Sequence, residues 1–260
     1  MDKKEPVICF GQQPCGFFPK RFLYAKIQTA RKLQKEIGGR IVFFYHDSDA
    51  DYRETITILE DKNTEEEVRL NFVSKNKIQK KYSPLYKKEI ENGWKEDIIN
   101  KLPRFVSKAV IDLFSTVNEK NSADFCLELY KKMGLFDGIE IMRSGDKDFR
   151  MQASELTEEY YADVEYEGEI VRAEMHEGKF RLHEGGGKYI TIPTPEKIEK
   201  WQKNPGRDYR FGWMQSVIHC THYISGAGEG NYLRKDDFPE VIFVNREEID
   251  KSNYAYIPSL

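Results

Sequence analysis

One stretch near the N-terminus restricts the fold more than any other, because it holds two apolar runs separated by a loop and a helical stripe. Residues 6–10 predict a short strand, and residues 11–20 predict a loop marked by two glycines and two prolines. Over residues 21–37, leucine, isoleucine and alanine recur at helical spacing before two consecutive glycines, and residues 40–45 form an uninterrupted apolar run. Such a run is typical of a strand buried on both faces. Together these elements predict one right-handed crossover of a parallel sheet.

The middle of the chain is predicted to carry insertions into this sheet. Helical periodicity, interrupted by a proline, runs over residues 83–117, and residues 122–133 predict a short helix with Ser122 at its N-cap. Residues 138–143 predict another strand of the sheet. From residue 164 to 192, β-favouring stretches alternate with glycine-bearing turns, which predicts a small antiparallel meander.

The remaining elements complete the predicted sheet. A threonine, a proline at the first helical position and early glutamates predict a short helix over residues 194–202. Residues 211–233 are interpreted as a return to the sheet, and residues 241–244 as its last strand. We therefore predict a single Rossmann-like α/β domain over residues 1–260, with a parallel sheet core and insertions at about 62–135 (helical) and about 160–192 (antiparallel β meander).

Composition and charge exclude several classes of protein. The chain has 41 basic and 44 acidic residues and a formal net charge of −3, whereas a dedicated nucleic-acid binder normally carries a basic excess. Its longest apolar runs have the length of strands, far short of the roughly 20 residues that a membrane span needs. The N-terminus lacks the long apolar core and cleavage site of a signal peptide. We therefore expect a cytoplasmic protein with no nucleic-acid or membrane partner, and the sequence predicts no particular oligomeric state.

The four cysteines are scattered and form no CxxC pair, so we expect reduced thiols. Most of them suit small buried positions, but Cys15 lies in a Gly/Pro loop where packing alone does not demand a cysteine. His219, Cys220 and His222 are residue types that ligate zinc. No second pair lies at finger-like spacing, so no metal site is predicted there.

The loop after the first strand is the first candidate binding site. In parallel α/β folds, ligands bind beyond the carboxyl ends of strands, near helix N-termini. Gly11 and Gly16 allow the backbone to approach a ligand, and Gln12 and Gln13 place amide donors and acceptors at the strand end. The alternative is an ordinary turn, because the loop matches neither a Walker A motif nor a GxGxxG fingerprint.

Basic residues of the following helix extend this candidate site. Lys20 and Arg21 work against the helix dipole and therefore make more sense beside an anionic ligand. The alternative for both is an exposed position on a turn. Lys26 projects into the apolar stripe of the helix, so it must snorkel, pair with a carboxylate or meet a ligand.

An acidic turn after the second buried strand is the second candidate site. It holds His46, Asp47, Asp49 and Asp51. Carboxylates so close together repel one another, so Asp49→Asn is expected to leave the stability of the apo protein equal or higher. If the strand continued, the three aspartates would point one way, which suits recognition of an amine or hydroxyls, a general base or Mg²⁺. The alternatives are a solvated acidic turn and a phosphohydrolase built on His46 and Asp47, although those enzymes place this pair on a helix.

The third candidate site is a glycine-rich loop late in the chain, at residues 225–230. Glu229 lies within it, and glycines plus one acid suit close approach to a polar ligand such as a sugar or an amino acid. The alternative is a helix N-terminus at which Glu229 interacts favourably with the dipole.

The motifs of these three sites follow one another along the chain in the same order as in a known family. The first site contributes a GQQ sequence, a Gly/Pro/aromatic loop and a helix with a lysine, here Lys26. The acidic turn contributes an Asp-x-Asp pattern, an aromatic residue and a glutamate, here Asp49, Asp51, Tyr52 and Glu54. The late segment contributes Arg210, Gln215, Tyr223, Gly226, Gly228, Glu229 and Tyr232. In this order the chain resembles the bacillithiol biosynthesis cysteine-adding enzymes, in a short form.

The resemblance implies a Rossmann-like core akin to class I aminoacyl-tRNA synthetases and nucleotidylyltransferases. It also implies that the chain joins cysteine to the amine of an amino sugar, glucosaminyl-malate. Cysteine and this amino sugar are therefore the implied small-molecule partners. This ligation requires activation, so a nucleotide or another energy source is implied, with ATP and Mg²⁺ as the candidate pair. The implied catalytic residues are Asp49, Asp51 and His46. The implied substrate-binding residues are Gln12, Gln13, Gly16, Lys26, Arg210, Tyr223, Gly226, Gly228, Glu229 and Tyr232.

Three departures from that family leave other functions open. The printed sequence stops before the family's C-terminal coiled coil, and Ser48 and Ala50 stand where the family has glutamate and histidine. Lys26 matches the family's lysine only with an offset of one residue. The first hypothesis is a cysteine-ligase-like enzyme. The second is another ATP-dependent carboxylate–amine ligase or a nucleotidyl transferase on the same core. The third is a non-catalytic relative that binds a sugar or an amino acid.

Overall fold

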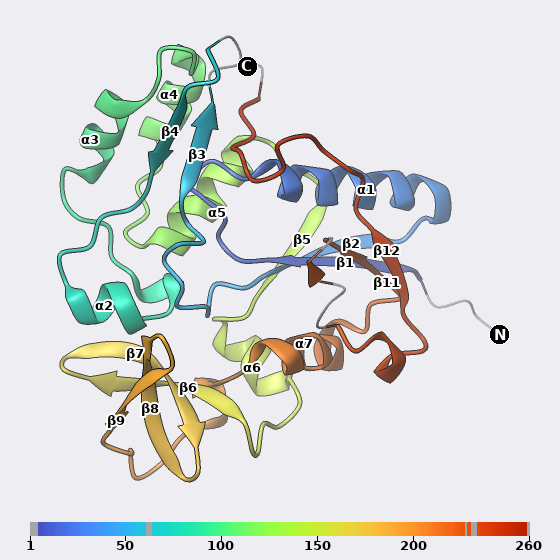
Figure 1. Cartoon of the computed structure of the whole chain (residues 1–260). Coiled ribbons are helices and arrows are strands. Elements are labelled where there is room, and N and C mark those ends of the chain that lie inside the picture. Colours follow the sequence, from blue (N-terminus) through green and yellow to red (C-terminus); the bar gives the residue numbers. More distant parts are fainter. Residues whose placement is uncertain (1–4, 61–63, 227, 230–232, 259–260) are drawn as a thin grey trace.

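The computed structural model describes residues 5–60, 64–226, 228–229 and 233–258, with a five-stranded parallel sheet at its centre (Figure 1). The strand order is β12-β11-β1-β2-β5, which is 5-4-1-2-3 when these strands are numbered along the chain. This is the order of a Rossmann core, and it confirms the predicted α/β fold. The strands are β1 (Val7–Gln12), β2 (Arg40–Tyr45), β5 (Ile139–Arg143), β11 (His222–Ser225) and β12 (Ile242–Asn245). The order reverses between β1 and β11, so their carboxyl ends are the place where such folds bind ligands.

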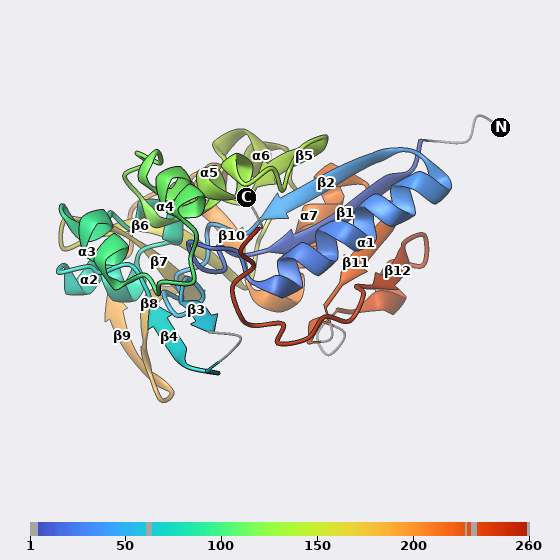
Figure 2. The same cartoon turned by 90° about the horizontal axis from the view of Figure 1, so that it is seen from above.

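Helices cover both faces of this sheet (Figures 1 and 2). On one face lie α1 (Arg21–Ile37) and α5 (Ser122–Lys132), and on the other lie α6 (Lys147–Gln152) and α7 (Arg210–Ile218). Side chains alternate along a strand, so Ile8 and Phe10 pack in the core on the α1 and α5 face, while Cys9 packs in the core on the α6 and α7 face. The bounds of α1 and β2 are the predicted ones, and β1 runs two residues beyond its prediction because it keeps pairing with β2.

The first insertion leaves the sheet after β2 and packs against the same core as α1. It contains β3 (Thr57–Glu60), β4 (Glu67–Leu70), α2 (Lys77–Tyr82), η1 (Leu85–Lys87), α3 (Trp94–Lys101) and α4 (Lys108–Ser115). The hairpin of β3 and β4 was not predicted. Trp94 packs edge-on against Phe125 of α5, with ring centroids 5.2 Å apart, which joins the insertion to the sheet domain.

The second insertion is the predicted antiparallel meander, with strand order β10-β6-β7-β8-β9. It consists of β6 (Tyr160–Tyr166), β7 (Glu169–His176), β8 (Lys179–Gly185), β9 (Lys188–Ile192) and the short β10 (Lys203–Pro205). The first turn places Glu167 and Gly168 at positive φ, 51° and 79°, as a two-residue hairpin turn requires. The meander has its own core, and both insertions lie beyond the carboxyl ends of β1 and β2 (Figures 1 and 2).

Three local predictions are wrong. Residues 194–202 form only the 3₁₀ turn η2 (Lys200–Gln202), because Glu199 is extended and its N–H donates to Gln202 Oε1 at 2.9 Å, which places the N-cap at Glu199 and not at Thr194. Residues 211–233 do not return directly to the sheet, since most of α7 precedes β11. The N-cap of α5 is Asn121, whose Oδ1 accepts a bond from the Asp124 N–H at 2.9 Å, and Ser122 is already helical. Among the described residues, no helix combines the length and the apolar character needed to cross a bilayer.

Lys88 is a buried lysine whose bonded partners among the described residues are neutral. Its Nζ donates to the carbonyl oxygens of Gln79, at 3.1 Å, and Lys80 at the end of α2. Burial lowers the pKa of Lys88 to about 7, against the opposing effect of Asp51 and Asp49.

We expect the free energy of unfolding to rise by about 2 kcal/mol between pH 7 and pH 9, relative to the variant Lys88→Met. In this interval the unfolded chain, with its ordinary lysine pKa of 10.5, binds more protons than the folded protein, so stability rises with pH. Urea unfolding at both pH values measures the difference. Lys87→Met changes the exposed neighbour and should follow the wild type. Equal pH slopes in the wild type and Lys88→Met would contradict the prediction.

Candidate functional site

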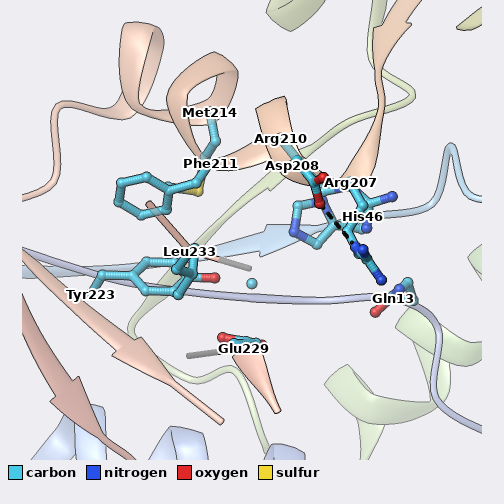
Figure 3. A pocket seen from close by; sticks show the side chains of 11 residues that line it. Gln13, His46, Arg207, Asp208, Arg210, Phe211, Met214, Tyr223, Glu229 and Leu233 are labelled. Atoms are coloured by element: carbon cyan, nitrogen blue, oxygen red, sulfur yellow. Dashed lines mark hydrogen bonds and ion pairs between the residues drawn. The ribbon is translucent and has the colours of Figure 1, made fainter. Parts of the chain in front are cut away.

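A narrow cavity lies at the reversal point of the sheet, beyond the carboxyl ends of β1 and β11 (Figure 3). Its volume is about 30 Å³, which is room for about two water molecules. It therefore suits the polar end of a ligand. The lining residues come from β1, η3 (Arg207–Tyr209), α7 and β11 and from the loops after β1, β2 and β11: Gly11, Gln13, His46, Arg207, Asp208, Arg210, Phe211, Met214, Tyr223, Glu229 and Leu233.

A buried ion pair joins Lys26 of α1 to the late glycine-rich loop. The Lys26 side chain is only 1% exposed, and its Nζ donates to Glu229 Oε1, to the Gly11 carbonyl oxygen at 2.8 Å and to Gln12 Oε1 at 3.4 Å. Glu229 Oε2 also accepts a bond from the Gly226 N–H at 3.2 Å. Lys26 thus pairs with a carboxylate, as one of the predicted alternatives requires. That carboxylate comes from the third candidate site and not from the acidic turn.

A second ion pair joins the acidic turn to α7. Arg210 Nη2 lies 3.2 Å from Asp49 Oδ2, and Gln13 Nε2 donates to the same oxygen at 3.5 Å. Burial acts to raise the pKa of Asp49, but the charges of Arg210 and of Arg172 on β7 outweigh it and hold this pKa below its usual range. Asp49 is therefore an anion at neutral pH.

The predicted repulsion within the acidic turn is offset, because each aspartate pairs with an arginine. Asp47 is fully buried and accepts a bond from Arg143 Nε at 2.7 Å. Asp51 pairs with the exposed Arg53, with Nη2 2.6 Å from Oδ2. The three aspartates do not point one way, since β2 ends at Tyr45 and the chain turns there. Asp51, predicted as catalytic, does not line the cavity.

His46 presents a neutral imidazole to the cavity. Its ring packs edge-on against Phe44, with centroids 4.5 Å apart, and its buried Nδ1 has no hydrogen-bond partner among the described residues. Burial, followed by the charges of Arg210 and Lys26, holds the pKa of His46 well below 6.5. The imidazole is therefore uncharged at neutral pH, and its cavity-facing nitrogen can either accept a hydrogen bond from a ligand or donate one to it.

Gly11 is needed for the close approach of its neighbours across the cavity. A Cβ atom at this position would lie 2.7 Å from His46 Nε2 and 3.0 Å from Tyr223 Oη. We expect Gly11→Ala to lower the free energy of unfolding by about 1–3 kcal/mol, because the packed imidazole must move. Thermal or urea unfolding measures this loss. In Gly228→Ala the new Cβ meets no atom within 4 Å, so this control should stay within about 0.5 kcal/mol of the wild type.

Other predicted site residues lie outside the cavity wall. Gly16 has a φ of 96°, and a Cβ there would lie 2.6 Å from the Phe18 carbonyl oxygen, so the loop needs glycine for packing. Gln12 lies behind Gln13, to which its Nε2 donates at 3.0 Å. The predicted Gly226 and Gly228 belong to the loop that carries Glu229, whereas the predicted Tyr232 lies outside the described residues.

The N-terminus of α1 is closed by the protein itself. The N–H groups of Arg21 and Phe22 donate to the carbonyl oxygens of Tyr254 and Ser252, at 2.8 and 3.0 Å. These are the groups that would otherwise bind an anion. The anionic ligand predicted beside Lys20 and Arg21 is therefore not supported by this geometry.

Cys15 is a core residue despite its place in a Gly/Pro loop. It is fully buried, and the Tyr130 hydroxyl lies 3.8 Å from its Sγ. Burial raises the pKa of the Cys15 thiol, so this cysteine is not set up to react.

Sequence reasoning missed Arg172, which faces the acidic turn from the meander. Its Nε donates to Asn204 Oδ1 at 2.7 Å and its Nη2 to the Pro205 carbonyl oxygen at 3.0 Å, so its bonded partners are neutral. The alternation along β7 carries a signal, because Arg172 stands between the buried Val171 and Ala173 and must face the other side of the meander. Only the tertiary structure shows that this side faces Asp49.

The described residues of this rim do not fit ATP with Mg²⁺. Phosphates favour free N–H groups at a helix N-terminus, and those of α1 are occupied. Mg²⁺ prefers carboxylates, and the aspartates of the acidic turn are each held by an arginine. Within the described part of the chain, no three His, Cys, Asp or Glu side chains are grouped so as to hold a metal ion.

Comparison with known proteins adds no family assignment. No protein-family model matches the chain, and no curated protein matches it either. What the cavity does must therefore be argued from its own residues.

Proposed function

We propose that the cavity binds the ammonium and carboxylate groups of a small amino acid, and that the protein joins this amino acid to the amine of an amino sugar, with a nucleoside triphosphate bound outside this rim activating the carboxylate and taking up the oxygen that amide formation releases. One observation carries the proposal. One member of each of two ion pairs lines the same cavity, Glu229 of the Lys26–Glu229 pair and Arg210 of the Arg210–Asp49 pair, and the neutral His46 lines it as well. Figure 3 shows Glu229 and Arg210 on opposite sides of the space.

Such a site favours a zwitterion over a ligand with net charge. Glu229 can accept the ammonium group and Arg210 the carboxylate, and the total charge of the site then stays balanced. A ligand with only one of these charges would leave a buried charge uncompensated, which is costly in a low-dielectric site. Phe211 and Met214 complete the wall and offer an apolar, polarisable contact to a small side chain such as a thiol. Cysteine is the amino acid that the resemblance suggests.

Calorimetric titration tests the binding part of the proposal. We expect L-cysteine to bind, and cysteine methyl ester and N-acetylcysteine to bind at least tenfold more weakly, because each lacks one charge. Glu229→Gln should weaken cysteine binding by a similar factor. The control is Glu247→Gln, which removes an exposed ion pair to Lys32 of α1, the helix that also carries Lys26. This variant should bind cysteine as tightly as the wild type. Equal affinities for cysteine and its two derivatives would overturn the proposal.

Incubation with cysteine, glucosaminyl-malate, ATP and Mg²⁺ tests the reaction itself. A ligase produces the cysteinyl amide, which mass spectrometry detects. AMP or ADP formed only with other acids and amines would instead indicate another ligase or a nucleotidyl transferase on this core.

A second candidate function is binding without turnover. It is favoured by the poor fit of the rim to ATP with Mg²⁺, and by Ser48, which bonds Ser144 at 2.8 Å between Oγ atoms in place of the family's glutamate. On this proposal cysteine or a sugar raises the melting temperature, while the incubation described above forms no amide.

A further inference from the structure

Arg172 of β7 is held against the segment of the chain that leads into α7. Its Nε donates to Asn204 Oδ1 at 2.7 Å and its Nη2 to the Pro205 carbonyl oxygen at 3.0 Å. Its guanidinium also stacks on Tyr161, 3.7 Å from the ring centroid. The turn η3 follows this segment and leads directly into α7, whose first residue is Arg210. These contacts fix the guanidinium of Arg172 relative to the part of the chain that carries Arg210.

Arg172 and Arg210 share one carboxylate, that of Asp49. Asp49 Oδ2 lies 3.2 Å from Arg210 Nη2. The hydrogen-bonded partners of Arg172 are neutral, and the strongest attraction that a charged group exerts on it comes from Asp49. The other carboxylates near this place have cations of their own: Asp51 pairs with Arg53, Asp163 with Arg150 and Asp208 with Arg207. Asp49 therefore compensates two guanidinium groups at once.

This sharing bears on ligand binding, because Arg210 lines the cavity whereas no described residue of the meander does (Figure 3). A carboxylate that binds Arg210 from the cavity comes close to Asp49, and two carboxylates beside a single guanidinium repel each other. The cation of Arg172 on the far side removes much of this cost, because each anion then has a guanidinium of its own. Arg210 can exchange Asp49 for the ligand while Asp49 stays compensated.

We propose that Arg172 is a positioning residue of the amino-acid site, which takes over Asp49 when the carboxylate of the ligand binds Arg210. Arg172 thereby makes the site selective for ligands with a free carboxylate without touching them. The inference rests on the proposed function for the identity of the ligand. It gives the meander a part in the specificity of a cavity that lies in the sheet domain.

Calorimetric titration of Arg172→Gln with L-cysteine and with cysteine methyl ester tests this role. Glutamine removes the charge and keeps hydrogen-bond donors. We expect the affinity for cysteine to fall by about tenfold or more, because Asp49 then has no second cation to turn to. The affinity for the methyl ester should change by less than about twofold, since the ester brings no carboxylate near Asp49. The preference for cysteine over its ester therefore nearly disappears. A merely structural role would weaken both ligands alike and leave their ratio unchanged.

Two further variants serve as controls. Arg172→Lys keeps the positive charge and should keep most of the wild-type preference for cysteine. Arg181→Gln changes an arginine of the neighbouring strand β8 that likewise pairs with a carboxylate, Glu174 at 2.9 Å, and stacks 4.0 Å from the ring centroid of Tyr189. It should bind both ligands as the wild type does. Circular dichroism checks that all three variants fold. An unchanged ratio in Arg172→Gln, or a ratio lost to the same extent in Arg172→Lys, would overturn the inference.

A double-mutant cycle on stability tests the pairing without any ligand. We expect Asp49→Asn to lower the folding equilibrium constant about fivefold less in the Arg172→Gln protein than in the wild type, because one of the two cations that Asp49 compensates is then gone. If cysteine binds the wild type with the expected preference while the ratio ignores Arg172, this inference falls and the proposed function stands. If cysteine does not bind the wild type, the proposed function falls, and additive effects in the cycle would overturn the pairing of Arg172 with Asp49 as well.

Discussion

Replacing Asp47 by alanine is expected to lower the free energy of unfolding by about 2–4 kcal/mol, because it removes a fully buried carboxylate that accepts bonds from three residues. Asp47 has no exposed surface, and it ties the end of β2 to the end of β5. Its oxygens accept bonds from Arg143 Nε at 2.7 Å, from the Gly145 N–H at 2.7 Å and from Ser144 Oγ at 3.2 Å. Arg143 then keeps its pair with Asp124 at 2.6 Å and Ser144 Oγ keeps its bond with Ser48 Oγ at 2.8 Å, while the Gly145 N–H loses its acceptor. Urea unfolding at pH 7 measures the loss.

Asp51→Ala is the matched control, four residues further along the same turn. Asp51 pairs with Arg53, whose side chain is 74% exposed, and exposed pairs contribute about 0–1 kcal/mol. The control should therefore stay within about 1 kcal/mol of the wild type. A similar loss in both variants would show that Asp47 is no more important to the fold than an ordinary surface aspartate.

The sheet and its first crossover were predictable because their signals are local. The apolar stripe of α1 keeps helical spacing on both sides of Lys26, and Gly38 ends the helix with a φ of 75° that favours glycine. The apolar run of β2 is continuous because both faces of this strand are covered. The meander was predictable for the same reason, since each Glu-Gly turn stands between β-favouring stretches.

The site was predictable in its location and not in its contacts. The rule that carboxyl ends of parallel strands meet at one rim brings Gln13, Asp49 and Glu229 together, although the last two are far apart in the chain. The same rule does not predict which charged side chains pair with each other. Glu229 meets Lys26 over 203 positions, and Asp49 meets Arg210 over 161. Such partners depend on how distant elements pack, which no local pattern records.

Helix ends and turns show the same limit. The first N–H groups of α1 looked available for a ligand, because the segment that closes them comes from the other end of the chain. For Arg172, the sequence pattern predicts only on which side of β7 the side chain lies. What that side faces depends on how the meander packs against the sheet. Local patterns therefore predict elements, while the chemistry of the rim depends on tertiary contacts.

The second large effect is expected for Asp49→Asn, which should lower the free energy of unfolding by about 2–4 kcal/mol at pH 7. The sign is opposite to the one that the sequence predicts, because Asp49 does not face uncompensated carboxylates. It compensates Arg210, whose Nη2 lies 3.2 Å away, and the nearby Arg172. Asparagine keeps the shape but replaces one acceptor oxygen by a donating NH₂ group and removes the charge, so Arg210 and Arg172 lose the anion that compensates them.

The pH dependence of this difference follows from the lowered pKa of Asp49. A carboxylate whose pKa is lower in the folded than in the unfolded protein stabilises the fold at every pH above its unfolded value, 3.8, and this stabilisation is lost as the pH falls through the folded value. The stability difference between wild type and Asp49→Asn should therefore be constant from about pH 7 to pH 5 and shrink below about pH 4. Urea unfolding at pH 7, 5 and 3.5 measures it.

Two further variants separate charge compensation from other causes. Asp112→Asn removes an exposed carboxylate on α4 that has no ion pair among the described residues, and it should change stability by less than about 0.5 kcal/mol. The double variant Asp49→Asn/Arg210→Met removes both charges and should recover part of the loss, because replacing a whole ion pair costs less than breaking it. If Asp49→Asn were as stable as the wild type at pH 7, the like-charge repulsion expected from the sequence would be the correct description of this turn. The amino-acid site would then lose the compensated Arg210–Asp49 pair on which its preference for a zwitterion rests.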